Sequence, residues 1–160
     1  MHFKLSKSAK SFFSNIINTG GSHAAEDKNK FSQFDVYYCC ALIGMTVCKL
    51  DESTSDLDDM VEGYPKPYVK HKENIAGLLV ATEAKRQGIS SSSPKIEEIM
   101  IKYLGNGPTL LSEDGIKTLN AYSLKGYYLL VENFLPDKPT SREEFLESVN
   151  MAITYYTKEE

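Results

Sequence analysis

The longest apolar run in the chain extends from Val36 to Cys48 and is interrupted by Gly44 and Thr46. It is too short to cross a lipid bilayer, which takes roughly 18 or more apolar residues, and no other segment of the sequence is longer. Its length and composition are those of a helix buried in the core of a folded domain. We therefore expect a central helix over residues 32–50 and no membrane-spanning segment.

Small side chains recur along this helix at the spacing of one face. Cys40, Gly44 and Cys48 are at positions i, i+4 and i+8, so they form one stripe along which another helix can approach closely. Gly126, within the segment SLKGYYLL, provides a matching gap on a later helix. We expect the two helices to cross near Gly44 and Gly126, with the cysteines as small buried hydrophobic residues.

The cysteines and histidines carry no pattern of metal binding or nucleophilic catalysis. Cys39 and Cys40 are adjacent, so on a helix their side chains diverge by about 100° and do not hold one ion together. His2, His23 and His71 lie in three separate segments without ligand spacing. No base that would keep a cysteine as thiolate is near Cys39 or Cys40 in sequence, and Lys49 beside Cys48 is a weak exception. We expect no metal site, no cofactor and no catalytic residue.

Carboxylates suitable for acid–base catalysis are not paired in the sequence. Glu83, Glu97 and Glu98 fall on amphipathic helical segments, where a charged side chain is usually solvated. We expect all three to be ordinary surface acids.

Elsewhere, apolar residues recur every three or four positions in segments that are separated by glycine, proline and helix-capping residues. No alternating run bounded by hairpin turns competes with this pattern. We therefore predict an all-α fold, a compact bundle of six or seven helices. The residues expected to begin or end these helices are Gly20 and Gly21, Gly88, Ser93 with Pro94, Ser112, Pro136, and Thr140 with Glu143.

The first 30 residues differ from the rest in composition: a basic, serine-rich segment with an apolar stripe precedes the polar stretch SHAAEDKNK. We predict a loosely attached N-terminal basic helix with a polar linker over residues 1–30, and a single helical domain over 31–160. An organelle presequence or a membrane-surface helix is the alternative for the first segment, which lacks the apolar core and cleavage site of a secretory signal. Three cysteines, an odd number, argue against a disulfide framework, so the cytoplasm is the expected location.

The net charge of −4 does not suit a protein whose whole surface binds nucleic acid. The charge is divided into blocks, however. Residues 1–50 carry six lysines against three acids, and residues 51–62 carry six acids and no base. Blocks of this kind mark solvated loops and faces more often than binding sites.

The segment GYPKPYVKHK, residues 63–72, is the strongest local candidate for a contact surface, because tyrosines and lysines alternate in it. Lysines of this kind contact phosphates or acidic partners, and tyrosine rings can pack beside them. The other interpretation is a solvated loop whose lysines balance the acids at 51–62. The candidate contact residues are Tyr64, Lys66, Tyr68, Lys70 and Lys72.

A family resemblance is carried by three longer segments: FDVYYCCALIGM, ENIAGLLVATEAKRQGI and LNAYSLKGYYLLVENFL. The first contains Ala41-Leu42-Ile43-Gly44 and the last contains Tyr122-Ser123-Leu124-Lys125-Gly126. These motifs resemble those of small helical proteins associated with bacterial DNA phosphorothioation (Dnd-type) and related phage-defence systems, with Ser123 where the family pattern has alanine. The resemblance spans about residues 34–153 and implies a helical accessory protein with no assigned chemistry. The acidic stretch at 51–62 and the N-terminal helix depart from the pattern.

These observations favour a non-enzymatic helical accessory or adaptor subunit that binds a larger protein. A nuclease or ATPase of a bacterial antiphage DNA modification–restriction system is the partner that the resemblance implies. The alternative is a nucleic-acid-binding module that uses Lys4, Lys7 and Lys10 together with the loop at 63–72. An enzyme whose site is assembled from distant residues ranks third.

Overall fold

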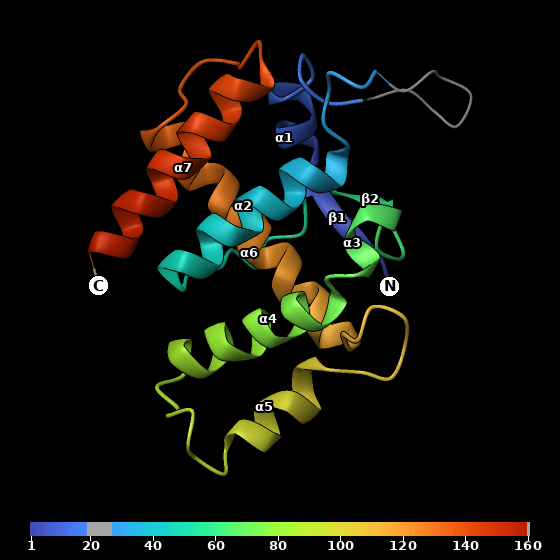
Figure 1. Cartoon of the computed structure of the whole chain (residues 1–160), viewed down its shortest axis with the longest axis vertical. Helices are drawn as coiled ribbons and strands as arrows, with labels where there is room; N and C mark the ends of the chain where they lie inside the picture. Colours follow the sequence, from blue (N-terminus) through green and yellow to red (C-terminus); the bar gives the residue numbers. More distant parts are fainter. Residues whose placement is uncertain (19–26, 160) are drawn as a thin grey trace.

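The computed structural model describes residues 1–18 and 27–159 of the chain (Figure 1). These residues contain seven helices and one antiparallel pair of short strands. The predicted all-α fold is therefore wrong, because the protein combines helices with a small sheet. The elements in chain order are β1 (Phe3–Ser6), α1 (Lys7–Phe12), α2 (Gln33–Val47), β2 (Leu57–Val61), α3 (Lys66–Val69), α4 (Lys72–Arg86), α5 (Ile96–Tyr103), α6 (Glu113–Asn133) and α7 (Arg142–Lys158).

The two strands form from segments that look charged rather than apolar in the sequence. In β1, the buried side chains of Phe3 and Leu5 alternate with the half-buried Lys4. Strand β2 lies inside the acidic stretch, in a register that places Lys4 opposite Asp59. Opposite charges that face each other across an antiparallel pair stabilise the pairing. The basic and acidic blocks of the sequence are therefore partners of each other within the fold.

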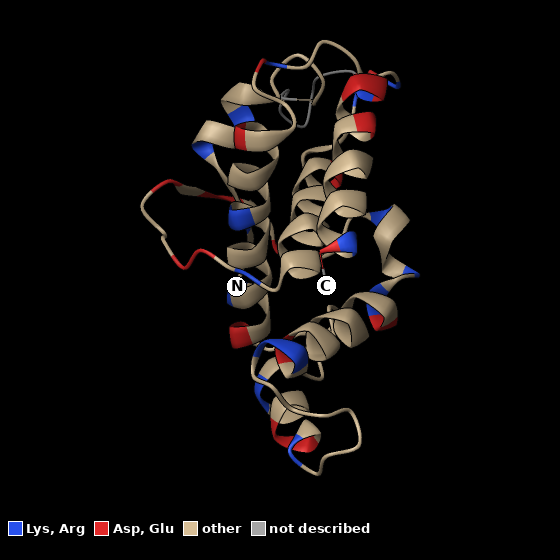
Figure 2. Ribbon diagram, turned by 90° about the vertical axis from the view of Figure 1, so that its left-hand side faces the viewer, with Lys and Arg blue, Asp and Glu red and all other residues tan. Residues whose placement is uncertain are grey.

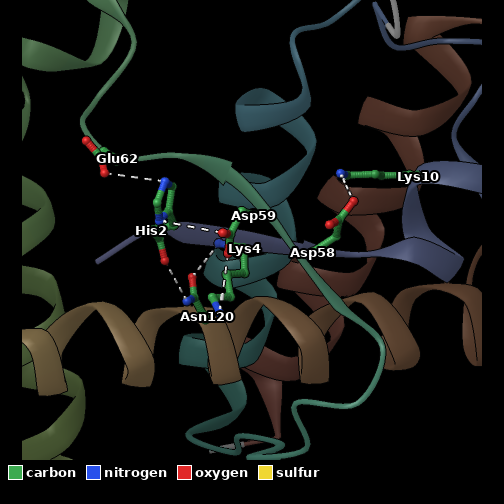
Figure 3. A network of polar contacts seen from close by, with 7 residues as sticks. All are labelled: His2, Lys4, Lys10, Asp58, Asp59, Glu62 and Asn120. Atoms are coloured by element: carbon green, nitrogen blue, oxygen red, sulfur yellow. Dashed lines mark hydrogen bonds and ion pairs between the residues drawn. The ribbon is translucent and has the colours of Figure 1, made fainter.

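Ion pairs extend this match along the sheet (Figure 3). The Lys4 Nζ lies 3.4 Å from the Asp59 Oδ1, and the Lys10 Nζ lies 2.8 Å from the Asp58 Oδ2. The His2 Nδ1 approaches the other Asp59 oxygen at 3.7 Å. All of these side chains are partly exposed, so solvent screens the attraction and each pair contributes little to stability. Their main effect is to fix which residues face each other.

One buried amide joins the sheet to the helical core. The Oδ1 of Asn120, on α6, accepts hydrogen bonds from the Lys4 backbone N–H at 3.0 Å and from the Tyr37 hydroxyl at 2.8 Å. The Nδ2 of Asn120 donates to the His2 carbonyl at 3.2 Å (Figure 3). Phe3 is fully buried in the same region. The N-terminal segment is therefore part of the core, and the expectation of a loosely attached helix is wrong.

The N-terminal helix is also shorter than the apolar stripe suggested. Helix α1 ends at Phe12, and Ile17 then forms an isolated bridge with Phe31. Phe13, Ile16 and Ile17 are nevertheless buried, because the non-helical segment after α1 packs on the core. The features that lie outside the described residues are the predicted helix stop at Gly20 and Gly21, His23, and the linker up to residue 26.

Helices α2 and α6 cross at the centre of the molecule (Figure 1). At the crossing, a Cβ atom added to Gly44 would meet the backbone carbonyl of Tyr122, and one added to Gly126 would meet the carbonyl of Cys40. The two backbones thus touch directly. The Ser123 hydroxyl reinforces the contact by donating a 2.9 Å hydrogen bond to the Tyr37 carbonyl.

Most helix ends lie where capping chemistry places them, and two differ. Gly88 has φ of 70° directly after α4, as expected of a left-handed C-cap. Helix α5 begins at Ile96, later than the Ser93 cap predicts, because residues 91–95 form turns first. The N-cap of α7 is Ser141 instead of Thr140, and its hydroxyl accepts from the Glu144 N–H at 3.2 Å.

We expect Gly126→Ala and Gly77→Ala to change stability in opposite directions. At Gly126 the methyl group has no space against the α2 backbone, so the free energy of unfolding falls by about 3 kcal/mol or more. Gly77, within α4, has no atom within 4 Å of an added Cβ, so alanine raises the free energy of unfolding by about 1 kcal/mol through helix propensity. Urea unfolding followed by circular dichroism measures both, and equal effects would contradict the direct backbone contact.

Candidate functional site

The predicted contact surface at 63–72 is divided by the fold. The Tyr68 ring packs on Phe34 with 4.6 Å between ring centroids, and its hydroxyl donates a 2.6 Å hydrogen bond to the Asp35 Oδ1. Tyr64 stacks on Phe3 at 5.3 Å. Burial raises the pKa of both tyrosine hydroxyls, and the bond to Asp35 raises that of Tyr68 further. Both rings therefore belong to the aromatic core around α2.

The lysines of this surface are separated from the rings. Lys66 and Lys70 are exposed on and after the short helix α3, and Lys72 is half-buried where α4 begins. The structure thus leaves the lysines largely at the surface, while both tyrosine rings are partly buried against the core.

The lysines of the alternative nucleic-acid surface are also engaged. Lys4 and Lys10 pair with carboxylates of β2, and the Lys7 N–H donates a 2.8 Å hydrogen bond to the Asp56 carbonyl, which brings Lys7 beside the same acidic segment. Figure 2 shows basic and acidic residues interspersed along the ribbon. A groove that follows a phosphate backbone needs a continuous positive stripe, and these three lysines do not supply one.

The four residues assigned to helix packing lie as follows. Gly44, Gly126 and the fully buried Cys40 meet at the α2–α6 crossing. Cys48 lies at the end of the same helix as its C-cap, half-buried, with φ of 57°. Burial raises the pKa of Cys40 well above the usual range of a thiol. This thiol therefore stays protonated and is a packing group.

An apolar groove lies between α4 and α5, the helices at the lower end of the molecule in Figure 1. Its volume is about 720 Å³. Ile101 is 74% exposed and Met100 is 44% exposed, although both are large apolar residues. Two carboxylates, Glu73 and Glu97, stand in the lining, which includes no lysine or arginine. We call this feature the α4–α5 groove; Ala76, Gly77, Leu104, Gly105, Asn106 and Leu110 complete its lining.

A buried ionic cluster lies toward the C-terminal end of α4. Glu83 is 0% exposed, so the expectation of a surface acid is wrong. Its two oxygens accept from the Arg86 guanidinium at 3.0 Å and 2.6 Å, and one also accepts from the Tyr122 hydroxyl at 2.5 Å. The Gln87 Nε2 donates to the other oxygen at 3.1 Å and approaches the Tyr103 hydroxyl at 3.5 Å. A carboxylate of α4 thereby binds groups from three helices.

These donors decide the charge of the cluster. Burial alone would raise the pKa of Glu83, but the hydrogen bonds from Arg86, Tyr122 and Tyr103 outweigh it, and the pKa is lowered. Burial and the neighbouring carboxylate raise the pKa of Tyr122. The cluster therefore consists of an ionised glutamate, a fixed arginine and neutral tyrosines that donate hydrogen bonds. A signal for it existed in the sequence, because Arg86 and Gln87 follow Glu83 at i+3 and i+4.

We expect Cys39 and Cys40 to differ in reactivity in the native protein. Burial raises the pKa of Cys39 to about 11, so only a small fraction is thiolate at pH 8, and Cys40 has no exposed surface. An aromatic disulfide reagent at pH 8 should leave Cys40 unmodified and modify Cys39 slowly, faster as the pH rises. The same reagent on the unfolded chain provides the control, and rapid modification of all three native thiols would contradict the packing role.

We expect Glu83→Gln to lower the free energy of unfolding by about 2 kcal/mol, because Arg86 and Tyr122 lose a charged acceptor. Glu97→Gln, at an exposed position, should change it by less than about 0.5 kcal/mol. A lowered folded pKa makes the carboxylate of Glu83 stabilising above about pH 4.3, the pKa of an unfolded glutamate, and this contribution is lost as pH falls through the folded value. Urea titrations between pH 7 and pH 3 measure the free energy of unfolding of wild type, Glu83→Gln and Glu97→Gln. The values of wild type and Glu83→Gln should converge at low pH.

Within the described residues, no group of three or more histidine, cysteine, aspartate or glutamate side chains is arranged to hold a metal ion. No described helix has the length and apolar character needed to cross a membrane. Comparisons of the chain with protein-family models, with curated proteins and with solved structures found no match. The resemblance to Dnd-associated proteins therefore stays a prediction, and a function for this chain rests on its own surfaces.

Proposed function

We propose that this protein is a non-enzymatic adaptor subunit of the cytoplasm that binds a larger protein through the α4–α5 groove. The observation that carries the proposal is the exposure of Ile101 and Met100 beside a recessed apolar lining. Single exposed apolar residues are ordinary on protein surfaces, but adjacent ones that border a groove favour a docking site.

A backbone feature of the groove supports the same interpretation. Leu110, one of its lining residues, has φ of 61°, in the left-handed region that favours glycine or asparagine. The turn is closed by hydrogen bonds from the Leu110 N–H to the Gly107 carbonyl and from the Gly105 N–H to the Leu110 carbonyl, both 3.0 Å. Keeping a leucine in this conformation costs about 1 kcal/mol or more. Such a cost is understandable where the side chain is needed on a binding surface.

The lining also indicates what the groove binds. Two helices that border an apolar channel form the kind of surface on which an amphipathic helix lays its apolar face. Glu73 and Glu97 give the groove a negative charge, so lysine or arginine residues beside the apolar stripe of the partner helix would find opposite charges there. The proposed occupant is thus a basic amphipathic helix of a larger protein.

The resemblance to defence-associated helical proteins supports a nuclease or an ATPase as that larger protein. The nucleic-acid alternative has weaker support, because Lys4 and Lys10 already pair with Asp59 and Asp58 inside the chain. An adaptor needs no reactive group, and the buried thiol of Cys40 and the neutral tyrosines of the Glu83 cluster agree with a structural role for these side chains.

Gly77→Met tests the proposal, because it fills the groove without disturbing the fold. An added side chain at Gly77 meets no atom within 4 Å at its Cβ, and removing a mid-helix glycine favours helix α4. Asn150→Met, at an exposed position of α7, is the matched control. We expect affinity-tagged wild-type protein and Asn150→Met, expressed in the source organism, to retain the same partner by mass spectrometry, and Gly77→Met to lose it.

Identification of the partner then allows a direct measurement. Cross-linking should place a helix of the partner at the groove, and a synthetic peptide of that helix should bind wild type and not Gly77→Met in calorimetry. Recovery of the wild-type protein alone, or equal capture by Gly77→Met, would contradict the proposal, as would a cross-linked helix that carries acidic residues beside its apolar stripe.

A further inference from the structure

A second concave feature, separate from the α4–α5 groove, lies where β1, the segment 50–57, the ends of α4 and α5, and the first half of α6 meet. Its volume is about 340 Å³. Small-molecule sites in proteins range from about 300 to 1,000 Å³, so this cavity suits a small metabolite and not a peptide. We call it the α6 cavity.

Charges of both signs line the α6 cavity, and they come from different elements. The ends of α4 and α5 contribute only cations, Arg86 and Lys102. The segment 50–54 contributes only acids, Asp51 and Glu52. A cavity for a simple anion or cation would carry an excess of one sign, whereas here each charged wall can bind an opposite charge on one ligand.

Hydrogen bonds to Glu83 fix the position of Arg86 in the cationic wall. Arg86 lines the cavity and is fixed by the two hydrogen bonds to the buried Glu83, which use two of the five N–H donors of a guanidinium. Glu83 is fully buried and the Arg86 side chain is 36% exposed, so the pair fixes a charged group at the surface of the cavity. Lys102 is also restrained, with its Nζ 5.3 Å from the centroid of the Tyr103 ring, another residue of the lining.

The acidic wall has a defined conformation as well. The Asp51 N–H donates a 3.0 Å hydrogen bond to the Ala121 carbonyl of α6, which anchors the segment against the helix. The Asp51 Oδ1 accepts from the Ser53 N–H at 2.9 Å. Hydrogen bonds from the Ser53 side chain and backbone lower the pKa of Asp51, so its carboxylate is ionised at neutral pH. Glu52 beside it is exposed and adds a second negative charge.

We propose that the α6 cavity binds a small zwitterion, whose carboxylate lies on Arg86 and Lys102 and whose ammonium group lies on Asp51 and Glu52. Charge-assisted hydrogen bonds at both ends orient such a molecule. Asp114 and Lys117 of α6 add one charge of each sign to the same lining. Lys4 of β1 adds a further cation, whose Nζ lies 3.4 Å from the Asp59 Oδ1, so the two walls keep their opposite charges.

The test is a titration with zwitterions of increasing charge separation. The probes are glycine, the larger α-amino acids, β-alanine, γ-aminobutyrate and 6-aminohexanoate, added up to ~10 mM to the full-length ¹⁵N-labelled protein. We expect saturable amide shifts confined to residues 50–54, 86, 102–103 and 117–121 for at least one of them. The N-acetylated and the carboxamide forms of that probe, which lack one charge each, should bind about tenfold or more weakly.

Variants at exposed positions separate the two walls without removing a hydrogen-bonding group of the Glu83 cluster. Lys102→Gln should weaken binding of the zwitterion by about tenfold and leave the affinity of its carboxamide form unchanged. Glu52→Gln should also weaken binding of the zwitterion by about tenfold, but leave the affinity of the N-acetylated form unchanged. Lys138→Gln and Asp137→Asn, which change the same charges at exposed sites outside the lining, are the controls.

Three outcomes would overturn the proposal: no saturable shift with any probe, equal binding of the N-acetylated form, or wild-type affinity in Lys102→Gln and Glu52→Gln. Gly77→Met should bind the zwitterion as wild type does, so this result stands apart from the adaptor role of the α4–α5 groove.

Discussion

The backbone contact between α2 and α6 is the constraint on which the rest of this fold depends. Because neither Gly44 nor Gly126 has a side chain, the helices approach closely enough for the Ser123 hydroxyl to reach a carbonyl of α2 and for Asn120 to accept from Tyr37. Asn120 then also binds the backbone of β1, so the same approach positions the sheet. Larger residues at the crossing would therefore separate α2 from α6 and displace the sheet as well.

The helices were predictable because the sequence signals of a helix lie within the helix itself. The sheet was not predictable because its two strands are far apart in the sequence. Spacing of apolar residues and capping residues placed the central helix, α4 and α6 within a few positions. Strand β1 has four residues and β2 has five, and each is stable only against the other. Lys4 and Asp59 looked like solvated charges because nothing near either of them in sequence shows that they pair. The opposed charge blocks were the visible part of that pairing.

The candidate sites were harder to predict for two different reasons. Glu83 looked solvated because a carboxylate usually is, and its partner Tyr122 comes from a helix far along the chain. In α5, the spacing of apolar residues places Ile99, Met100 and Tyr103 on one face, and Ile101 extends the apolar surface further than one buried face can cover. Ile99 and Tyr103 point inward, and Met100 and Ile101 are left at the surface. That excess of apolar residues was the sequence signal of the α4–α5 groove.

Helix α4 links the two proposed sites physically. Gly77 and Glu73 line the groove, Glu83 bonds to Tyr122 of α6, and Arg86 lines the α6 cavity. The ionic cluster is therefore a specific polar connection between the α4–α5 pair and helix α6. Directional hydrogen bonds fix the position of α4 on α6 more precisely than apolar packing alone. A zwitterion on Arg86 and a partner helix beside Gly77 would act on the same rigid element. If either ligand shifts α4, linkage requires each to change the affinity of the other by the same factor.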